Sequence, residues 1–224
     1  MFAQTQNELH NMKHMSILAV SLLALVACTP EKKQEADYSQ YVNPMIGTDF
    51  TGNTYPGAQV PFGMVQLSPD NGLPGWDRIS GYFYPDTTIA GFSHTHLSGT
   101  GAGDLYDISF MPVTRPYKEA PAPLGIYSTF SHNDEAASAG YYRVLLKDYN
   151  INVELTATER CGIQRYTFPE AEASVFLNLK KAMNWDFTLD SKIEVVDSTT
   201  IRGYRLSQGW SPSQHVYFET RFSK

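Results

Sequence analysis

The chain lacks several features that would assign it to a common class of protein. It has two cysteines among 224 residues, Cys28 and Cys161, too few for the disulfide framework of a small secreted scaffold. Its lysines and arginines are scattered and its formal net charge is −6, so there is no basic stripe for nucleic acid, and a nucleic-acid partner is disfavoured. No apolar run approaches the roughly twenty residues of a membrane-spanning helix, and no segment beyond residue 40 sustains a helical period. These absences favour a strand-rich globular domain.

The composition supports a packed core. Hydrophobic residues make up 42% of the chain and aromatic residues 13%. Aromatic side chains are favoured in strands, and they also stack on the apolar faces of sugar rings. Strands account for most of them, so we expect about one or two to be available for a sugar.

The first residues predict a bacterial lipoprotein signal. A short basic start at Met12–His14 precedes the apolar run Ile17–Val26, which ends in a small-residue-then-cysteine pattern at Cys28. Residues 1–28 therefore predict a signal segment with lipidation at Cys28. A buried cysteine at the end of an amphipathic helix is the weaker alternative, because the run has no polar alternation. Residues 1–11 are polar, so we expect translation to begin at Met12.

The polar stretch 29–38 predicts a flexible tether ahead of a domain that begins at residue 39. Thr29, not aspartate, follows Cys28. By resemblance to other Gram-negative lipoproteins, this favours a lipid anchor at the outer membrane, within the bacterial cell envelope. With Cys28 modified, Cys161 has no disulfide partner and is expected to be a small buried hydrophobic side chain.

From residue 39 onward the sequence predicts strands. Short apolar runs, several alternating with polar residues, recur between turn signals, which is typical of antiparallel sheets packed as a sandwich. The predicted strands are 58–67, bent by Pro61 and Gly63, 105–112, 141–146, 151–158, 161–168, 174–179, 192–196, 200–207 and 214–222. The predicted fold class is all-β, a large antiparallel β-sandwich over residues 39–224.

The segment Gly91–Asp104 predicts a binding loop. It contains His94, His96 and several serine, threonine and glycine residues, with no charged residue before Asp104. Glycine lets the backbone approach a ligand closely, and neutral His, Ser and Thr groups suit sugar hydroxyls. A glycine-rich turn that only joins two strands is the alternative.

Four sequence blocks precede this loop in a fixed order. They are Tyr41–Thr48, Thr54–Ala58, Val60–Asp70 and Gly75–Tyr82. Together with the loop they closely resemble the amino-terminal domain of glycoside hydrolase family 92, a family of calcium-dependent exo-acting α-mannosidases. Lys181–Trp185 and Asp190–Glu194 are also similar to that domain, so the resemblance spans residues 39–224.

The resemblance implies a two-sheet β-sandwich that supplies one wall of an active-site cleft. It also implies that the acid and base of this inverting reaction, and most of the calcium environment, belong to a carboxy-terminal helical domain that is missing here. The candidate carboxylates, Asp77, Asp104, Asp107 and Glu159, form no convincing catalytic pair. We therefore expect no catalytic residue and no metal ligand in this chain, and a truncated protein that is inactive alone.

Site residues follow from the resemblance where the motifs match. Trp76 matches the family position whose aromatic side chain contacts the sugar next to the scissile bond. The alternative is that Trp76 plugs one end of the sandwich. Ser98, Gly99 and Thr100 would present backbone and hydroxyl groups at the cleft. Asp77 and Asp104 are also predicted as substrate-binding residues, although capping of local backbone N–H groups is the favoured role of Asp104.

His94 and His96 are two positions apart and would face the same side of an extended segment. Calcium prefers oxygen ligands, so we expect these histidines to be hydrogen-bonding scaffold or sugar contacts. The pairs Ala102-Gly103 and Leu105-Tyr106 depart from the commonest family pattern, which leaves the subsite preference open.

Three functions stay open. The favoured one is the carbohydrate-binding sandwich domain of an α-mannosidase-like glycoside hydrolase, acting on mannose-containing glycans in N-glycan breakdown and lacking its catalytic domain. The alternatives are a stand-alone carbohydrate-binding lipoprotein and a non-enzymatic interaction domain whose loop is structural. In each case the only membrane contact would be the lipid on Cys28.

Overall fold

The computed structural model describes residues 36–99, 101–122, 124–170, 172–180 and 185–223. The chain from Tyr38 onward forms one compact unit. The predicted signal segment, with Cys28, and most of the predicted tether lie outside the described residues. In the part of the chain that is described, no helix has the length and apolar character needed to cross a membrane.

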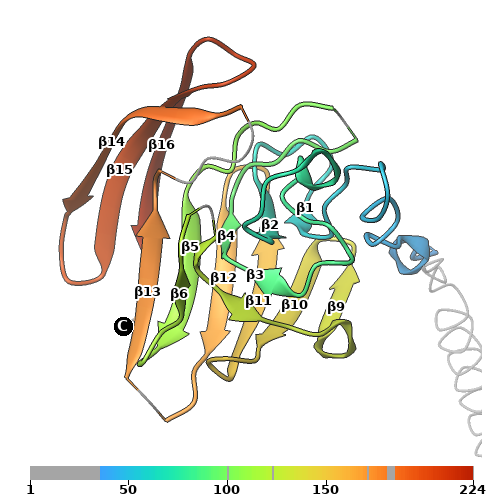
Figure 1. Cartoon of the computed structure of the whole chain (residues 1–224), viewed down its shortest axis with the longest axis horizontal. Helices are drawn as coiled ribbons and strands as arrows, with labels where there is room; N and C mark the ends of the chain where they lie inside the picture. Colours follow the sequence, from blue (N-terminus) through green and yellow to red (C-terminus); the bar gives the residue numbers. More distant parts are fainter. Residues whose placement is uncertain (1–35, 100, 123, 171, 181–184, 224) are drawn as a thin grey trace, which may run out of the picture. The chain divides into compact units, whose positions relative to one another are not determined.

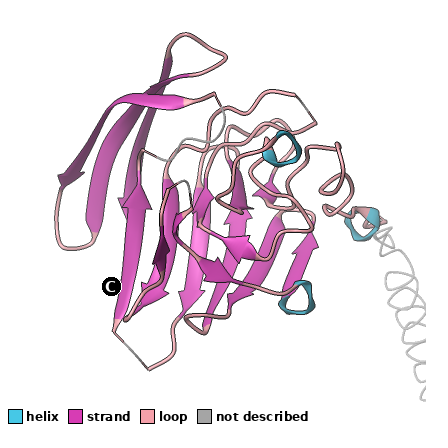
Figure 2. Cartoon of the chain, viewed as in Figure 1, coloured by secondary structure: helices cyan, strands magenta, loops and turns pink. Residues whose placement is uncertain are grey.

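The fold is all-β, as predicted, and the described strand pairs are antiparallel (Figure 1). The helices among the described residues are short 3-10 turns, drawn in cyan in Figure 2, at Ser39–Tyr41 (η1), Trp76–Arg78 (η2) and His132–Asp134 (η3). Strand propensity and turn signals therefore identified the class of fold correctly.

Three larger sheets and two short strand pairs make up the unit. The five-stranded sheet has the order β1 (Ala58–Gln59), β2 (Gln66–Asp70), β4 (Gly91–Ser93), β5 (Ser109–Thr114) and β13 (Ala173–Asn178). The four-stranded sheet has the order β12 (Gly162–Thr167), β11 (Ile151–Ala157), β10 (Tyr141–Leu146) and β9 (Glu135–Ser138). The three-stranded sheet is β14 (Phe187–Val195), β15 (Thr200–Gln208) and β16 (Gln214–Arg221). The short pairs are β3 (Thr88–Ile89) with β8 (Ser128–Thr129), and β6 (Glu119–Ala120) with β7 (Gly125–Ile126).

The main hydrophobic core lies between the five-stranded and four-stranded sheets. Along β10 and β11 every second residue is fully buried, the period expected when one face of a sheet covers a core. Val144 and Val153 pack there with Leu67 and Val113 from the opposite sheet. Each such side chain contributes about 1.5–3 kcal/mol when it is fully buried, so this core holds the sandwich together.

A second, smaller cluster connects β5 and β13 to the three-stranded sheet. Ile108, Phe110 and Leu179 are buried in it, and Val216 and Phe218 of β16 pack against them. All six residues of β5 are buried, because one face of the strand covers the main core and the other covers this cluster. β14, β15 and β16 stand beside the edge of the sandwich that β13 forms (Figure 1).

One predicted strand begins later than expected. The run 105–112 becomes regular only at Ser109, because Leu105, Tyr106 and Ile108 have φ values of 81°, 62° and 55°. These values belong to the left-handed region, which a strand cannot use. The predicted strand 58–67 is interrupted between β1 and β2, where its proline and glycine stand.

The expectation that Cys161 is buried is wrong, because Cys161 is exposed. The residue lies in the turn between β11 and β12. Its backbone N–H donates to Thr158 Oγ1 at 3.1 Å, and its carbonyl accepts from the Thr158 N–H at 2.8 Å. The closing hydrogen bonds of a tight turn therefore place this side chain outside the core.

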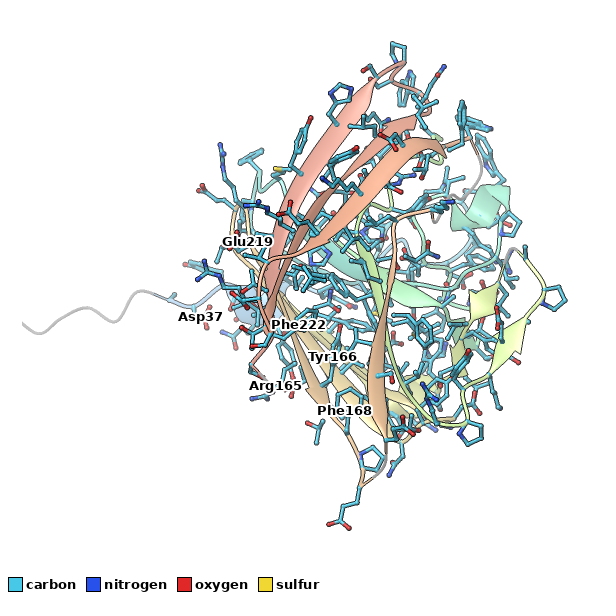
Figure 3. All side chains as sticks on the ribbon, turned by 90° about the vertical axis from the view of Figure 1, so that its left-hand side faces the viewer. Asp37, Arg165, Tyr166, Phe168, Glu219 and Phe222 are labelled. Atoms are coloured by element: carbon cyan, nitrogen blue, oxygen red, sulfur yellow. The ribbon has the colours of Figure 1, made fainter. Side chains whose placement is uncertain are left out.

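A groove of about 510 Å³ lies where the four-stranded and three-stranded sheets approach each other. Tyr166 of β12 and Phe222, which follows β16, both line it (Figure 3). His94 and Gly162 also contribute to its wall. The groove is therefore formed by segments that are distant in sequence.

Candidate functional site

The three tryptophans of the chain lie around one glycine-rich loop. Trp76, Trp185 and Trp210 have relative exposures of 57%, 55% and 69%. A Cβ atom placed on Gly101 would lie 3.0 Å from Cη2 of Trp76. A cavity of about 490 Å³ is lined by Gly101, Ala102, Trp185, Gly209 and Trp210. A cluster of exposed large aromatic side chains is typical of a ligand surface.

Trp76 opens the 3-10 turn η2. The turn is fastened by Arg78, whose Nε and Nη2 donate to the two oxygens of Asp86 at 2.6 and 2.5 Å. The same guanidinium lies 4.7 Å from the ring centroid of Phe83. Asp77 is partly exposed. Trp76 therefore projects from an anchored turn and does not plug the core.

Asp104 fixes Trp210 to the loop. Its side chain is 2% exposed, and its Oδ2 accepts from the Trp210 backbone N–H at 2.9 Å and from Gln214 Nε2 at 2.7 Å. Its Oδ1 accepts from the Leu105 N–H at 2.8 Å. Capping of backbone N–H groups, the favoured prediction for Asp104, is thus observed, and one of the capped groups is 106 positions away.

Arg205 of β15 lies fully buried beneath the loop. Its Nη1 donates to Asp107 Oδ1 at 2.6 Å, and its Nη2 donates to Asp186 Oδ2. Its Nε donates to Thr188 Oγ1 at 3.0 Å. A buried guanidinium is stable only when such partners surround it. The ion cluster therefore fastens β15 to the loop that carries Asp107.

Within this cluster, the carboxyl group of Asp186 has a shifted pKa. Burial raises the pKa of Asp186 to about 6; the nearby charges of Asp104 and Asp107 raise it further, and hydrogen bonding and attraction to Arg205 oppose the rise. Its Oδ1 is buried and has no hydrogen-bond partner among the described residues. The cluster thus combines one cation with three carboxylates.

His96 is held in a buried network. Its Nδ1 lies 2.7 Å from the Gln66 carbonyl oxygen, and its Nε2 lies 2.8 Å from Asp70 Oδ1 and 3.0 Å from Ser93 Oγ. A nucleophilic triad needs the carboxylate and the hydroxyl on opposite ring nitrogens, whereas here both contact Nε2. The Ser93, His96 and Asp70 arrangement is therefore structural and does not activate a nucleophile.

His94 lies on a different side of the segment from His96. Its Nδ1 donates to the Ile108 carbonyl at 2.7 Å, and its ring meets Phe110 edge-on with centroids 5.8 Å apart. Burial lowers the pKa of His94. It lines the groove beside β12 and not the tryptophan cavity. The two histidines do not face one side as expected, because β4 ends at Ser93 and the chain is no longer extended.

The other predicted residues lie near the tip of the loop. Ser98 and Gly99 are exposed, and the Gly99 N–H donates to the Asn53 carbonyl at 2.6 Å. Gly99 has a φ of +69°, which favours glycine. Thr100 falls outside the described residues. Whether these groups contact a sugar stays a prediction.

Sequence reasoning missed Trp185 and Trp210 as site residues. Trp185 stood in a block that resembles the family and Trp210 in a turn signal, but neither position has a local pattern that points to the loop. The Trp185 N–H donates to the Gly103 carbonyl at 3.3 Å, a contact that sequence spacing does not predict. The usable signal was the small number of tryptophans, since three in the whole chain made each a candidate.

The described residues do not fit a calcium site. Among them, no group of three or more His, Cys, Asp or Glu side chains could hold a metal ion. Calcium takes about six to eight oxygen ligands. The oxygens of Asp104 and Asp107 instead accept from Arg205, Thr95 Oγ1 and backbone N–H groups.

Comparison with known proteins places this arrangement in a family. Residues 41–224 match the "Glycosyl hydrolase family 92 N-terminal domain". The chain belongs to glycosyl hydrolase family 92. The family 92 domain accounts for the resemblance found in the sequence and for the all-β fold.

Solved structures of the family superpose well on this family 92 domain. A family GH92 α-mannosidase from Bacteroides thetaiotaomicron in complex with mannoimidazole has a TM-score of 0.78 and 44% identity, covering 83% of this chain and 25% of that one. A family GH92 inverting mannosidase from the same species has a TM-score of 0.65 and 28% identity, covering 84% and 25%.

A curated relative is also a glycosidase by its description. An "Uncharacterized secreted glycosidase" of Arthroderma benhamiae is 26% identical over 172 residues, which are 72% of this chain and 21% of the relative. The chain therefore spans about a quarter of the length of the mannosidases it matches and about a fifth of this glycosidase.

Proposed function

We propose that this family 92 domain forms the sugar-facing wall of an α-mannosidase-like glycoside hydrolase that acts on mannose-containing glycans, in N-glycan breakdown. The observation that carries the proposal is the gathering of Trp76, Trp185 and Trp210 around the loop at Gly101. Indole rings stack on the apolar faces of pyranoses. The similar mannosidase solved with mannoimidazole supports mannose as the sugar.

We propose further that this chain does not supply the catalytic acid and base. An inverting glycosidase needs two carboxyl groups about 6.5–9.5 Å apart with room for water between them. Asp104 and Asp107 are buried and accept hydrogen bonds from within the domain. Asp77 is a partly exposed carboxylate next to Trp76, and neither Asp104 nor Asp107 is free to serve as its partner. In this proposal both groups, and the calcium ion, belong to another segment of the full-length enzyme.

The cellular location is a separate proposal. A lipid on Cys28 would anchor the domain at the outer membrane of the bacterial cell envelope, with residues 29–38 as a tether. The basic, apolar and cysteine blocks of the leader support this arrangement. Mass spectrometry of the mature protein from cells should find a diacylated amino-terminal Cys28, and an unmodified chain that retains Met1 or Met12 would contradict the proposal.

Sugar binding is tested directly on the purified chain. Because all its tryptophans lie at the site, addition of methyl α-mannoside should change the intrinsic tryptophan emission, and the change should shrink strongly in Trp76→Ala. Tyr217→Ala is the control, since Tyr217 is 69% exposed on β16 outside the cavity. Methyl α-glucoside tests for stereochemical preference.

The same preparation separates the alternatives. We expect no release of p-nitrophenol from p-nitrophenyl α-mannoside, and turnover by the chain alone would contradict a purely binding role. If no mannoside alters either the emission or the melting temperature, the non-enzymatic interaction domain becomes the better interpretation.

A further inference from the structure

We propose that the cavity between Trp185 and Trp210 is a second sugar subsite, which takes the glycan unit next to the one that stacks on Trp76. The proposal rests on the proposed function. It assigns a role to two residues that the sequence pattern did not place in the site.

The cavity has the size and lining of a sugar subsite. Its volume is about 490 Å³, within the range of roughly 300–1,000 Å³ common for small-ligand sites. Two indole rings form its apolar surface, and more than half of each tryptophan remains exposed. Core tryptophans are highly buried, so the packing of the domain does not explain these two side chains.

The lining also indicates the charge of the ligand. Among the described residues, glycine, alanine and tryptophan form the cavity wall, and none of these lining residues is charged. The nearby carboxylate of Asp104 is 2% exposed and already accepts from Trp210, Gln214 and Leu105. None of these described lining residues would neutralise a phosphate or a sialic acid, whereas a neutral pyranose can use the indole faces and backbone groups.

The cavity adjoins Trp76 through Gly101. Gly101 lines the cavity, and a Cβ atom on it would lie 3.0 Å from Cη2 and 3.4 Å from Cζ2 of Trp76. Gly101, which has no side chain, thus lies next to both Trp76 and the cavity of Trp185 and Trp210. A linked disaccharide can cross the backbone closely at that point, with one ring on each side.

The two tryptophans are held in place before any ligand binds. The Trp185 N–H donates to the Gly103 carbonyl, and the Trp210 N–H donates to the buried Asp104 carboxylate. Gly209 packs so closely that a Cβ atom would lie 2.3 Å from Asp104 Oδ1. Ligands bind more tightly to groups whose ordering cost is already met, so this backbone anchoring favours a binding role.

The experiment compares a monosaccharide with disaccharides on the purified chain, by isothermal titration calorimetry. The ligands are methyl α-mannoside and α-linked mannobioses of each linkage, and the variants are Trp185→Ala, Trp210→Ala and Trp76→Ala, with Tyr217→Ala as control. We expect Trp185→Ala and Trp210→Ala to weaken the best mannobiose about tenfold, which corresponds to about 1.4 kcal/mol, and to weaken methyl α-mannoside much less. Trp76→Ala should weaken both ligands.

Each outcome has a distinct meaning. If the unaltered chain binds no mannoside, the proposed function itself fails. If it binds and both variants bind mannobiose as it does, the second subsite is overturned. The subsite is likewise overturned if the variants weaken monosaccharide and disaccharide equally, or if they change only self-association or assembly with another polypeptide.

A second pair of variants guards against misfolding. Trp185→Phe and Trp210→Phe keep an aromatic ring in each position and should retain part of the disaccharide preference. If the phenylalanine variants bind mannobiose no better than the alanine variants while melting at the original temperature, aromatic stacking is excluded and the proposal fails.

Discussion

The Asp104 carboxylate and the backbone N–H of Trp210 are joined by a 2.9 Å hydrogen bond across 106 positions of the sequence. Asp104 ends the glycine-rich loop, and Trp210 lies in the turn between β15 and β16. The hydrogen bond therefore attaches a hairpin of the three-stranded sheet to the loop that Trp76 contacts. Disturbing either end should change both the stability of the domain and the shape of the tryptophan cavity.

Gly209→Ala should expose this coupling. The added Cβ atom would lie 2.3 Å from Asp104 Oδ1, so the hairpin must move away and weaken the hydrogen bond to Trp210. We expect a loss of about 1–3 kcal/mol in the free energy of unfolding, measured by urea denaturation, together with a shift in tryptophan emission. Ser98→Ala, at an exposed position of the loop, is the control and should change neither quantity. Unaltered stability in Gly209→Ala would show that the loop and hairpin are independent.

Arg205→Met should be among the most destabilising substitutions in the domain. It removes the only cation that the described residues supply to this buried cluster, and it leaves Asp107 and Asp186 without their shared partner. Breaking a buried ion pair in this way costs about 3–5 kcal/mol. The matched control is Arg202→Met on the same strand, because the Arg202 and Glu194 pair is exposed and such pairs contribute about 0–1 kcal/mol. Equal effects of the two substitutions in chemical denaturation would refute the structural role of the cluster.

The raised pKa of Asp186 predicts a pH dependence with a definite sign. The pKa is about 6 in the folded protein, against a usual value of 3.8, so the folded state holds this proton more tightly than the unfolded state. The stabilising contribution is present at about pH 4 and is lost as pH rises through about 6. The free energy of unfolding of the native protein minus that of Asp186→Asn should therefore fall between about pH 4 and about pH 7. A constant difference would contradict the prediction.

His94 predicts the opposite slope. Burial lowers the pKa of His94 below its usual 6.5, so the unfolded state binds the proton more readily. Stability from this residue is present above about pH 6.5 and is lost as pH falls below it. In His94→Asn the amide can keep the hydrogen bond to the Ile108 carbonyl without titrating. The native-minus-variant difference should fall on acidification, and a rise would mean that the histidine is stabilised in its charged form.

The two pH effects overlap, which explains the need for variants. As pH falls, the contribution of Asp186 to the free energy of unfolding rises and that of His94 falls. The total pH profile of the native protein can therefore appear flat even when both groups contribute. Only the two differences against Asp186→Asn and His94→Asn separate them.

The strands that were predicted well share one property. β10 and β11 have short apolar alternations bounded by turn residues, and their observed bounds agree with the predicted ones within a residue. One face of each of these strands packs on the core and the other does not, so apolar and polar residues alternate along the sequence. Ile108 and Tyr106 show where that reasoning ends, since nothing in their side chains indicates a positive φ.

Cys161 shows a second limit. The hydrophobic character of a lone cysteine predicts burial, but the turn that closes β11 and β12 needs the hydrogen bonds of its backbone at that point. The geometry of the turn therefore outweighs the tendency of a cysteine side chain to be buried, and Cys161 is exposed.

From its sequence alone, this protein was determined to be an all-β member of a mannosidase family, because alternation, turn residues and ordered motif blocks are local properties. Trp76 and the glycine-rich loop were predicted as parts of the site from the same local motifs. Only the tertiary structure decided that Trp185 and Trp210 join them, that His94 and His96 face different surroundings, and that Arg205 forms ion pairs with both Asp107 and Asp186. These contacts link residues up to 106 positions apart, and chain folding, not sequence spacing, brings such residues within hydrogen-bonding distance.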